Sequence, residues 1–369
     1  MQLSDDQLAA FEEVCHFFGG EYDSQYMTLG GHAGTGKTTV IKELVRTYSG
    51  ATVMAPTGKA AHVLRKKGVA ATTIHKMIYS NTAPPGRPPK FQKKPYIGAR
   101  FIIVDESSMI SKQVLEDLLS YGAPILFVGD HGQLEPVGDN PGLMKNPDVR
   151  LEKVHRQADG SPIIRFATSI RQGKPPHPEE SDGLSVRRSG KLDKDTGTVI
   201  CGWNQTRHNI NAAGRKEYGD ATPQAEEPVI FLRNDPDMGV FNGMTANVVE
   251  CSPIGVFKNY DGIKSRVLDL TVIDDAGDVF RMPAVDPRDI QLLGKWPSPP
   301  LVYATEWMDN GNPPRAALCD FAYAITCHKA QGSEWPKVTV IYEKSKLWDN
   351  SRWAYTAATR ASEHLTFLC

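Results

Sequence analysis

Residues 31–38 read Gly-His-Ala-Gly-Thr-Gly-Lys-Thr and fit the phosphate-binding pattern G-x-x-x-x-G-K-S/T, which constrains the fold more than any other part of the chain. Residues 26–29 predict a short buried strand before this loop. After the loop, apolar side chains recur at helical spacing, at Val40, Ile41, Leu44, Val45 and Tyr48. Strand, glycine-rich loop and helix in this order predict an α/β domain that binds a nucleotide.

Each residue type in the loop suits phosphate binding. The glycines at 31, 34 and 36 allow a tight turn that points backbone N–H groups at phosphate oxygens. We expect Lys37 to neutralise the β- and γ-phosphates of ATP and Thr38 to hold Mg²⁺. The alternative is a glycine-rich turn before an ordinary helix, which does not explain why lysine and hydroxyl residues also stand in the required order.

Composition sets wider limits. The chain has 369 residues, enough for two or three domains, and its net charge of −1 neither favours nor excludes nucleic acid. Its six cysteines are scattered without a C-x-x-C pair, so we expect a reducing cytoplasm and neither a zinc site nor a disulfide framework. No signal peptide is evident at the first residues, and no apolar run is long enough to span a bilayer, so no membrane partner is expected.

The first part of the chain, up to about residue 155, alternates strand-like and helix-like segments. Apolar runs at 52–55, 101–104 and 125–128 each end in polar residues, which predicts buried parallel strands with functional groups at their carboxyl ends. Residues 81–96 are rich in Pro, Gly and Lys and are expected to protrude from the fold.

The rest of the chain predicts a second α/β domain that carries a β-module. Residues 172–197 read as a loop-rich connection, and a new α/β pattern begins at 198. Residues 245–290 alternate apolar and polar side chains with period two, and 274–278 read as a hairpin turn within them. An apolar strand at 338–341 and a final helix-strand unit follow.

Two acidic residues follow the strand predicted at 101–104. We assign Asp105 to the Mg²⁺ shell and Glu106 to the attacking water, which it can orient and deprotonate. A pair of solvated carboxylates at a strand end is the alternative, and the phosphate loop earlier in the chain favours the catalytic interpretation.

Two glutamines are candidates for contacts with the nucleotide. Gln133 follows the strand at 125–128 and could sense the γ-phosphate, although Asp130 could also simply stabilise a turn there. Gln7 stands three residues after Ser4, the spacing of a capping box, so helix capping is the better interpretation from spacing alone.

Hydrolysis also needs a cation that reaches the transition state, and an arginine from another domain could supply it. Arg156 and Arg360 are the two candidates. Taken singly, each is better explained as a surface ion-pair residue, because arginines are common.

The segment from Gly58 to Arg100 contains no Asp or Glu, although the chain as a whole is nearly neutral. Its basic residues are Lys59, Arg65, Lys66, Lys67, Lys76, Arg87, Lys90, Lys93, Lys94 and Arg100. Threonines and His75 can bind phosphates, and Tyr79, Phe91 and Tyr96 can stack on bases. A basic surface without a ligand is the alternative, but beside an ATP site a nucleic-acid track is favoured.

Taken together, these blocks resemble a superfamily 1 helicase of the RecD/Dda-like branch, which moves 5′ to 3′ on single-stranded DNA. The resemblance runs nearly end to end and keeps the order of the family's motifs. The matching blocks are Gly31–Thr39 (motif I), Ala55–Ala61 (Ia), Ala71–His75, Val104–Ser108 (II), Val128–Val137 (III), Leu151–Gln157 (IV), Trp203–Arg207, Phe241–Gly243, Ala324–Glu334 (V) and Tyr355–Ala361 (VI).

The resemblance implies further roles for matching residues. Gln7 becomes an adenine-binding residue as well as a cap, and Arg156 and Arg360 become γ-phosphate arginines. The nucleotide site then comprises Gln7, Gly34, Thr35, Gly36, Lys37, Thr38, Thr39, Gly332 and Glu334. The DNA-binding residues are Pro56, Thr57, Lys59, Thr73, His75, Phe91, Tyr96, Asn242, Thr326, His328 and Lys329.

The resemblance also predicts the domain plan of an α/β protein with two RecA-like P-loop domains. The first covers 1–155 with a strand-separating pin at about 81–97, and 156–197 connects it to the second. The second covers 198–244 and 319–369, interrupted by an SH3-like β insertion at 245–318.

The expected activity is ATP hydrolysis with Mg²⁺, coupled to 5′-to-3′ movement on single-stranded DNA and unwinding of forked duplex DNA. An ATP-gated nucleic-acid-binding protein that does not separate strands, or an RNA motor of the same superfamily, are the alternatives. The resemblance further suggests a functional monomer, replication or recombination proteins as partners, and a bacterial cell or phage-infected host as the setting.

Overall fold

The computed structural model describes residues 3–82, 91–135, 141–153, 160–192, 196–235, 238–258, 264–274, 277–292 and 316–369. The chain forms two compact units. The first comprises Met1–Tyr79, Lys93–Gly202 and Thr326–Cys369, and the second comprises Ser80–Gln92 and Trp203–Ile325. No helix among the described residues is long and apolar enough to cross a membrane.

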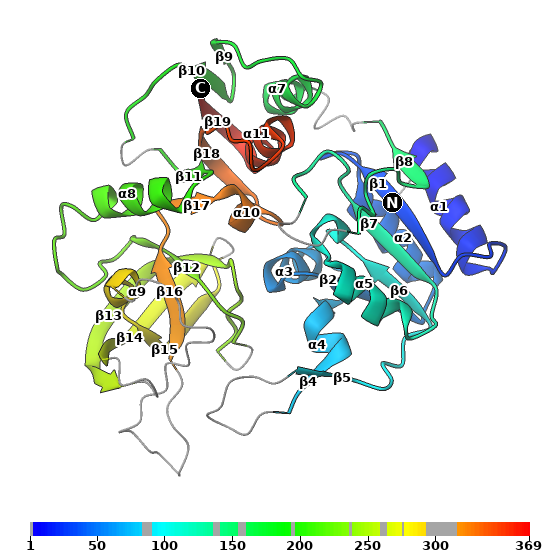
Figure 1. Ribbon diagram of the computed structural model, residues 1–369, viewed down its shortest axis with the longest axis horizontal. Coiled ribbons are helices and arrows are strands. Elements are labelled where there is room, and N and C mark those ends of the chain that lie inside the picture. Colours follow the sequence, from blue (N-terminus) through cyan, green and yellow to red (C-terminus); the bar gives the residue numbers. More distant parts are fainter. Residues whose placement is uncertain are drawn as a thin grey trace. The chain divides into compact units, whose positions relative to one another are not determined.

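A parallel six-stranded sheet forms the amino-terminal part of the first unit (Figure 1). Its strands, in spatial order, are β3 (Ala71–Thr73), β2 (Ala51–Ala55), β6 (Phe101–Val104), β7 (Ile125–Gly129), β1 (Tyr26–Gly31) and β8 (Val149–Leu151). The four apolar runs in the sequence are therefore strands, as predicted. Every residue of β7 is buried, as expected for a parallel strand covered on both faces.

The helices associated with this sheet follow its strands along the chain. They are α1 (Asp5–Phe18), α2 (Lys37–Thr47), α3 (Gly58–Lys66), α4 (Ile74–Ile78), the short 3₁₀ turn η1 (Ser107–Met109) and α5 (Lys112–Leu119). Val40, Ile41 and Leu44 of α2 are fully buried against the apolar side chains of α1 and β1. This burial fixes the position of α2, and with it the glycine-rich loop that precedes it.

A second sheet belongs mainly to the carboxyl-terminal part of the same unit. The division of the chain into the two units falls within its strand β17. Its strands, in spatial order, are β17 (Ala324–Thr326), β11 (Thr198–Cys201), β18 (Trp335–Ile341), β19 (Ala361–Leu368), β10 (Leu184–Arg187) and β9 (Glu179–Ser181). Helices α7 (Pro162–Arg171), α10 (Cys327–Ala330) and α11 (Asn350–Ala358) accompany it.

The loop-rich connection expected at 172–197 needs a correction. It contains β9 and β10, and β10 pairs in parallel with β19 near the end of the chain. Leu184 and Val186 are buried by this pairing, and Gly183 has a φ of +74° that allows the tight turn before them. Strands this short, with a partner far along the chain, leave too few alternating residues for the sequence pattern to reveal.

A closed five-stranded barrel forms most of the second unit. Its strands are β12 (Pro228–Phe231), β13 (Thr245–Lys258), β14 (Lys264–Asp274), β15 (Val279–Val285) and β16 (Ala317–Phe321), and α8 (Asn204–Gly214) and α9 (Pro287–Leu292) belong to the same unit. The barrel begins at 228 rather than 245, because β12 pairs with both β13 and β16 and closes it. The antiparallel pairing of β14 with β15 confirms the predicted hairpin.

Two short strands, β4 (Tyr79–Asn81) and β5 (Phe91–Lys93), form a separate two-stranded sheet. They flank part of the region expected to form the pin. Residues 83–90 of that region lie outside the described residues.

Candidate nucleotide site

The glycine-rich loop has the backbone conformation that the sequence predicts. Gly34 and Gly36 have φ values of +82° and +83°, which favour glycine. Lys37 begins α2, and its Nζ donates hydrogen bonds to the carbonyl oxygens of Gly31 (2.7 Å) and His32 (3.0 Å). The ammonium group therefore lies inside the curve of the loop, where a phosphate chain would need it. Thr38 and Thr39 occupy the first turn of α2 and are half-buried.

The acidic pair follows β6, next to this loop. Burial, together with the charge of Glu106, raises the pKa of Asp105 to about 6, and the positive charge of Lys37 opposes this rise. Lys37 and Asp105 thus share one electrostatic environment, as the assignment to a metal-bound triphosphate requires. Glu106 has a φ of +53°, a left-handed conformation that is costly for a residue with a Cβ. Such strain concentrates at functional sites, which favours a catalytic carboxylate over a solvated one.

Gln7 is buried and makes two hydrogen bonds, one of which is the predicted cap. Its Oε1 accepts a hydrogen bond from the backbone N–H of Ser4 (3.2 Å), which caps α1. Its Nε2 donates to the carbonyl oxygen of Thr35 in the glycine-rich loop (3.2 Å). The capping interpretation is confirmed, and the amide lies beside the loop where an adenine-binding role remains a prediction.

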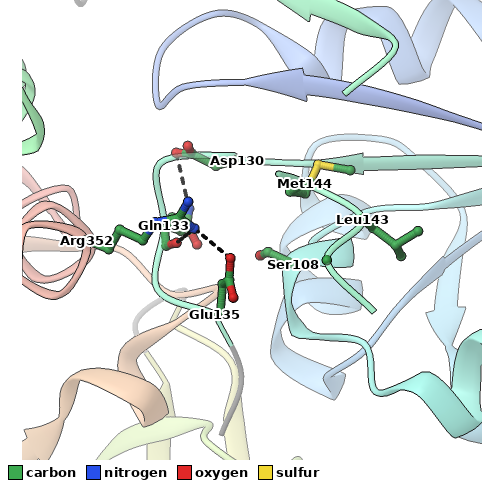
Figure 2. Close-up of a pocket in the computed structure, with 8 residues that line it drawn as sticks. Ser108, Asp130, Gln133, Glu135, Leu143, Met144 and Arg352 are labelled. Atoms are coloured by element: carbon green, nitrogen blue, oxygen red, sulfur yellow. Dashed lines mark hydrogen bonds and ion pairs between the residues drawn. The ribbon is translucent and has the colours of Figure 1, made fainter. Parts of the chain in front are cut away.

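The residues after β7, which we call the 130–135 loop, contribute Gln133 to a small pocket (Figure 2). The pocket has a volume of about 10 Å³, room for one water molecule, and its other lining residues are Ser108, Asp130, Glu135, Gly142, Leu143, Met144 and Arg352. Gln133 is only 4% exposed, and its Nε2 donates to Asp130 Oδ2 at 3.5 Å. Within the described residues, Gln133 Oε1 and Ser108 Oγ are buried without a hydrogen-bond partner.

Asp130 begins the 130–135 loop, makes several hydrogen bonds there and is 1% exposed. Its carboxylate accepts hydrogen bonds from the backbone N–H of Gly132 (2.8 Å) and from Tyr355 Oη (2.8 Å), and it lies 3.2 Å from His32 Nδ1. Burial alone would raise the pKa of Asp130, but the bond to His32 and the charge of Lys37 hold it below its usual range. Asp130 is therefore ionised at neutral pH.

Tyr355 of α11 joins the glycine-rich loop to the 130–135 loop. Its hydroxyl accepts a hydrogen bond from the backbone N–H of Ala33 (3.1 Å) while it donates to Asp130. Burial and the negative charge of Asp130 raise the pKa of Tyr355 well above its usual value, so the hydroxyl keeps its proton. The connection is extended by Thr356 Oγ1, which accepts from Leu134 N, and by Gln331 Nε2, which donates to Leu134 O, both at 2.7 Å.

Of the two candidate arginines, the structure describes only Arg360. Arg360 follows α11 and is buried, and its guanidinium donates to the carbonyl oxygens of Thr356 and Ser333 (both 3.0 Å) and to Thr359 Oγ1 (3.2 Å). These bonds use three of the five N–H donors of the guanidinium and leave two for another ligand. Arg156 lies outside the described residues.

In motif V, Gly332, a candidate for nucleotide binding, lies next to Thr57, a candidate for DNA binding. Gly332 has a φ of +70°, and a Cβ built there would lie 3.4 Å from Ala60 Cβ and 3.7 Å from Thr57 Oγ1. Thr57 caps α3 by accepting from Ala60 N (3.1 Å), and Thr73 caps α4 by accepting from Lys76 N (3.2 Å). The two threonines thus have a structural role at the carboxyl ends of neighbouring strands, β2 and β3. Pro56 precedes Thr57 and is half-buried, and Glu334 is exposed.

The other DNA candidates are spread over both units. Lys59 Nζ lies 4.4 Å from the centre of the Trp335 ring, a cation–π contact. Phe91 is 57% exposed and Tyr96 is 79% exposed, as stacking side chains require, and the His75 ring lies 5.2 Å from that of Tyr79. Thr326 is buried before α10, whereas His328 and Lys329 are half-buried within it. Asn242 belongs to the second unit, where its backbone N–H donates to Asn234 Oδ1 (2.9 Å).

Sequence reasoning assigned no role to His32, His131 or Tyr355, although each lies at the centre of the site. Tyr355 carried a usable signal, because a tyrosine within the apolar run of α11 needs a partner for its hydroxyl. His32 stands at an unspecified position of the G-x-x-x-x-G-K-S/T pattern, and for either histidine the residue type alone predicts no role.

Comparison with known proteins agrees with this geometry. A family model described as an AAA domain matches residues 2–188, and a UvrD-like helicase C-terminal domain matches residues 321–368. The first match covers more than half of the chain, so the protein belongs to this family of AAA-domain nucleotide-binding proteins.

Its relatives define the branch more closely. The chain is 26% identical over 401 residues to the ATP-dependent RecD2 DNA helicase of Deinococcus radiodurans, which covers 98% of this chain and 48% of that protein. It is 32% identical over 181 residues to the ATP-dependent DNA helicase dda of Enterobacteria phage T4, over 44% of this chain and 41% of that protein. The chain is thus similar to helicases of the RecD/Dda-like branch, and it spans less than half the length of each of these relatives.

Solved structures show the same fold. A structure of Pif1 helicases described as unwinding forked double-stranded DNA has a TM-score of 0.63 at 18% identity, covering all of this chain and 92% of that one. Bacteroides Pif1 bound to single-stranded DNA has a TM-score of 0.62 at 18% identity with the same coverage. The mixed α/β fold of this chain therefore resembles the two-domain RecA-like structure of Pif1.

Proposed function

We propose that this protein is an ATP-dependent DNA helicase that moves 5′ to 3′ on single-stranded DNA and unwinds forked duplexes. The observation that supports it best is the hydrogen-bonded connection from Ala33 in the glycine-rich loop, through Tyr355 and Asp130, to the 130–135 loop. A protein that only bound a nucleotide would need the glycine-rich loop but not this link to α11. A motor needs it, because the state of the nucleotide must reach the second sheet.

ATP with Mg²⁺ suits the residues around the glycine-rich loop. Lys37 already lies within the loop, and the raised pKa of Asp105 marks a buried carboxylate that a divalent cation would stabilise in its charged form. Thr38 and Asp105 would hold Mg²⁺, and Glu106 would orient and deprotonate the attacking water. Gln133, with its unpartnered buried Oε1, would contact that water or the γ-phosphate. Arg156 and Arg360 would stabilise the transition state.

Coupling to DNA would follow from the shared contacts of the 130–135 loop. When Arg360 engages the γ-phosphate, α11 and the segment with Gln331 and Gly332 must move with it, because Gln331 is bonded to Leu134. Gly332 lies beside Thr57, so this movement alters the surface where Thr57 would hold the strand. Each cycle of binding and hydrolysis would thereby shift the grip on DNA.

The DNA strand would lie along the carboxyl ends of β2 and β3 and over α10. Here Thr57, Thr73 and Thr326 each precede a helix, and Lys59, His328 and Lys329 lie within the following helices. Phe91 and Tyr96 would stack on bases beside the proposed strand-separating pin. The closed barrel would correspond to the SH3-like insertion, and Asn242 of the second unit would contact DNA separately.

DNA-stimulated ATP hydrolysis tests the nucleotide assignment. We expect single-stranded DNA to raise the ATPase rate, and Lys37→Ala to abolish turnover because the β/γ-phosphate contact is lost. Lys42→Ala is a matched control, since this lysine points from the same helix at a position outside the glycine-rich loop. Full hydrolysis by Lys37→Ala would refute the assignment, and a rate indifferent to DNA would refute the coupling.

Strand separation and direction need a second assay. Single-turnover unwinding of forks that carry only a 5′ tail or only a 3′ tail should give product with the 5′ tail alone. Hydrolysis without unwinding on either fork would instead indicate an ATP-gated binding protein. Preference for the RNA strand when matched RNA and DNA strands compete would point to an RNA motor.

A further inference from the structure

Two histidines and an aspartate meet beside the glycine-rich loop. His32 belongs to that loop, and Asp130 and His131 begin the 130–135 loop after β7. One nitrogen of each imidazole and one oxygen of the carboxylate all lie within 4.8 Å of one another. The rings of His32 and His131 are 3.9 Å apart between centres, and His32 Nδ1 is 3.2 Å from Asp130 Oδ1.

Hydrogen bonding explains only part of this cluster. His32 and Asp130 are bonded to each other, but His131 Nδ1 is buried and has no hydrogen-bond partner in the described part of the chain. An imidazole with an unused buried nitrogen has a lone pair that a metal ion can use.

We propose that His32, Asp130 and His131 form a site for a divalent transition-metal ion, for which Zn²⁺ is the best match. Two imidazole nitrogens and one carboxylate oxygen are ligands that Zn²⁺ prefers, and three protein ligands leave a fourth position for water. Ligand atoms about 2.0–2.2 Å from a tetrahedral ion lie roughly 3.3 Å apart, close to the spacing of His32 and Asp130. The sequence argued against zinc on its cysteines, and this site uses none.

The surroundings of Asp130 suit a metal ligand. Its second oxygen accepts the hydrogen bond from Tyr355, and the backbone N–H of Gly132 holds the first. Hydrogen bonds of this kind orient a ligating carboxylate and are a regular feature of metal sites. The ion would therefore find one ligand already buried and fixed in direction.

A bound ion would regulate ATP hydrolysis by the motor, and this inference rests on the proposed function. A bound ion would tie His32 of the glycine-rich loop to the 130–135 loop. The two loops could then no longer separate when the phosphates of ATP displace Tyr355 from Ala33. We expect Zn²⁺ to inhibit DNA-stimulated hydrolysis even at saturating Mg²⁺, because Mg²⁺ prefers oxygen ligands and competes poorly at imidazoles.

Metal binding is tested without nucleotide, so that its outcome is independent of helicase activity. Purified full-length protein without an affinity tag is titrated with ZnCl₂ in calorimetry, and with CoCl₂ in visible absorption spectroscopy. We expect one ion per chain and Co²⁺ bands typical of nitrogen and oxygen ligands in tetrahedral geometry. X-ray absorption of the Zn²⁺-loaded protein should show imidazole scattering from two histidines. Absence of a bound ion at 100-fold excess would overturn the proposal.

Variants locate the ion. His131→Asn and His32→Asn should each weaken Zn²⁺ binding by more than about tenfold, since loss of mere outer-shell partners costs about that much. His16→Asn is the control, because His16 lies on the surface of α1 in an ion pair with Glu21. Circular dichroism identifies any variant that fails to fold. In that case, the Co²⁺ and X-ray absorption spectra of the unchanged protein decide whether histidines bind the ion. Equal affinity in folded His131→Asn and His16→Asn would show that the histidines only form a hydrogen-bonded contact.

Discussion

Substitution of Tyr355 by Phe tests the connection between the two sheets of the first unit. The change keeps the ring, including its contact with Arg171 (5.9 Å), and removes only the hydroxyl. Asp130 then loses one of its two hydrogen bonds of 2.8 Å, and Ala33 N–H loses its acceptor.

The size of the effect follows from these contacts. A hydrogen bond to a charged buried group contributes about 1.5–3 kcal/mol, and Asp130 keeps its bonds from Gly132 and His32. Ala33 is half-buried, so water can replace part of its bond and its loss adds roughly 0.5 kcal/mol. We expect Tyr355→Phe to lower the free energy of unfolding of the first unit by about 2–3 kcal/mol.

Urea unfolding measures this change, with Tyr342→Phe as the matched control. Tyr342 also packs against aromatic rings, Phe367 of β19 at 5.4 Å and Trp353 of α11 at 6.1 Å, but within the described residues its hydroxyl has no hydrogen bond. Tyr342→Phe should therefore leave the transition unchanged.

The functional test uses the same pair of variants. If the connection carries the signal, the expected 2–3 kcal/mol limits the loss of DNA stimulation of the ATPase to roughly 140-fold. Basal hydrolysis should change much less, because Lys37, Asp105 and Glu106 are untouched. A folded Tyr355→Phe variant with full DNA stimulation would refute the proposed route between the sites.

Three further outcomes are expected. Glu227→Ala should destabilise the second unit by about 3–5 kcal/mol in urea unfolding, because it leaves Arg215 buried without its carboxylate, whereas Glu180→Ala on the surface should not. Gln7→Ala should raise the KM for ATP and reduce the preference for adenine over guanine nucleotides in competition assays; an unchanged preference would leave Gln7 as a cap only. Lys59→Ala should weaken binding to single-stranded DNA and reduce its salt dependence by about one phosphate contact in fluorescence anisotropy, and an unchanged slope would exclude that contact.

The features that could be predicted from the sequence are those set by neighbouring residues. The glycine-rich loop, its strand and its helix form from one continuous segment, so spacing and residue type were sufficient. The capping role of Gln7 is local in the same way. The buried strand β7 was visible because a parallel strand covered on both faces is apolar throughout.

The features that were missed depend on partners far along the chain. β10 is too short to show a pattern and exists because β19 pairs with it. The barrel closes through β12, which pairs with β16 nearly at the end of the second unit. Tyr355 and Asp130 are 225 residues apart, and neither residue alone indicates the other. Pairings of this kind are decided by the fold, which a linear pattern does not encode.

The contact between Ala33 and Tyr355 indicates how nucleotide and DNA could be linked reciprocally. In this structure the Ala33 N–H is bonded to Tyr355, although N–H groups of such a loop are the ones that bind phosphate. A phosphate that captured this N–H would release Tyr355 and alter the packing of α11 against the 130–135 loop. By thermodynamic linkage, DNA that favours the released arrangement must then tighten nucleotide binding by the same factor. ATP affinity measured with and without single-stranded DNA should therefore differ in the unchanged protein and converge in Tyr355→Phe. If the difference persisted in the variant, the linkage would have to run through other contacts, such as that of Gln331 with Leu134.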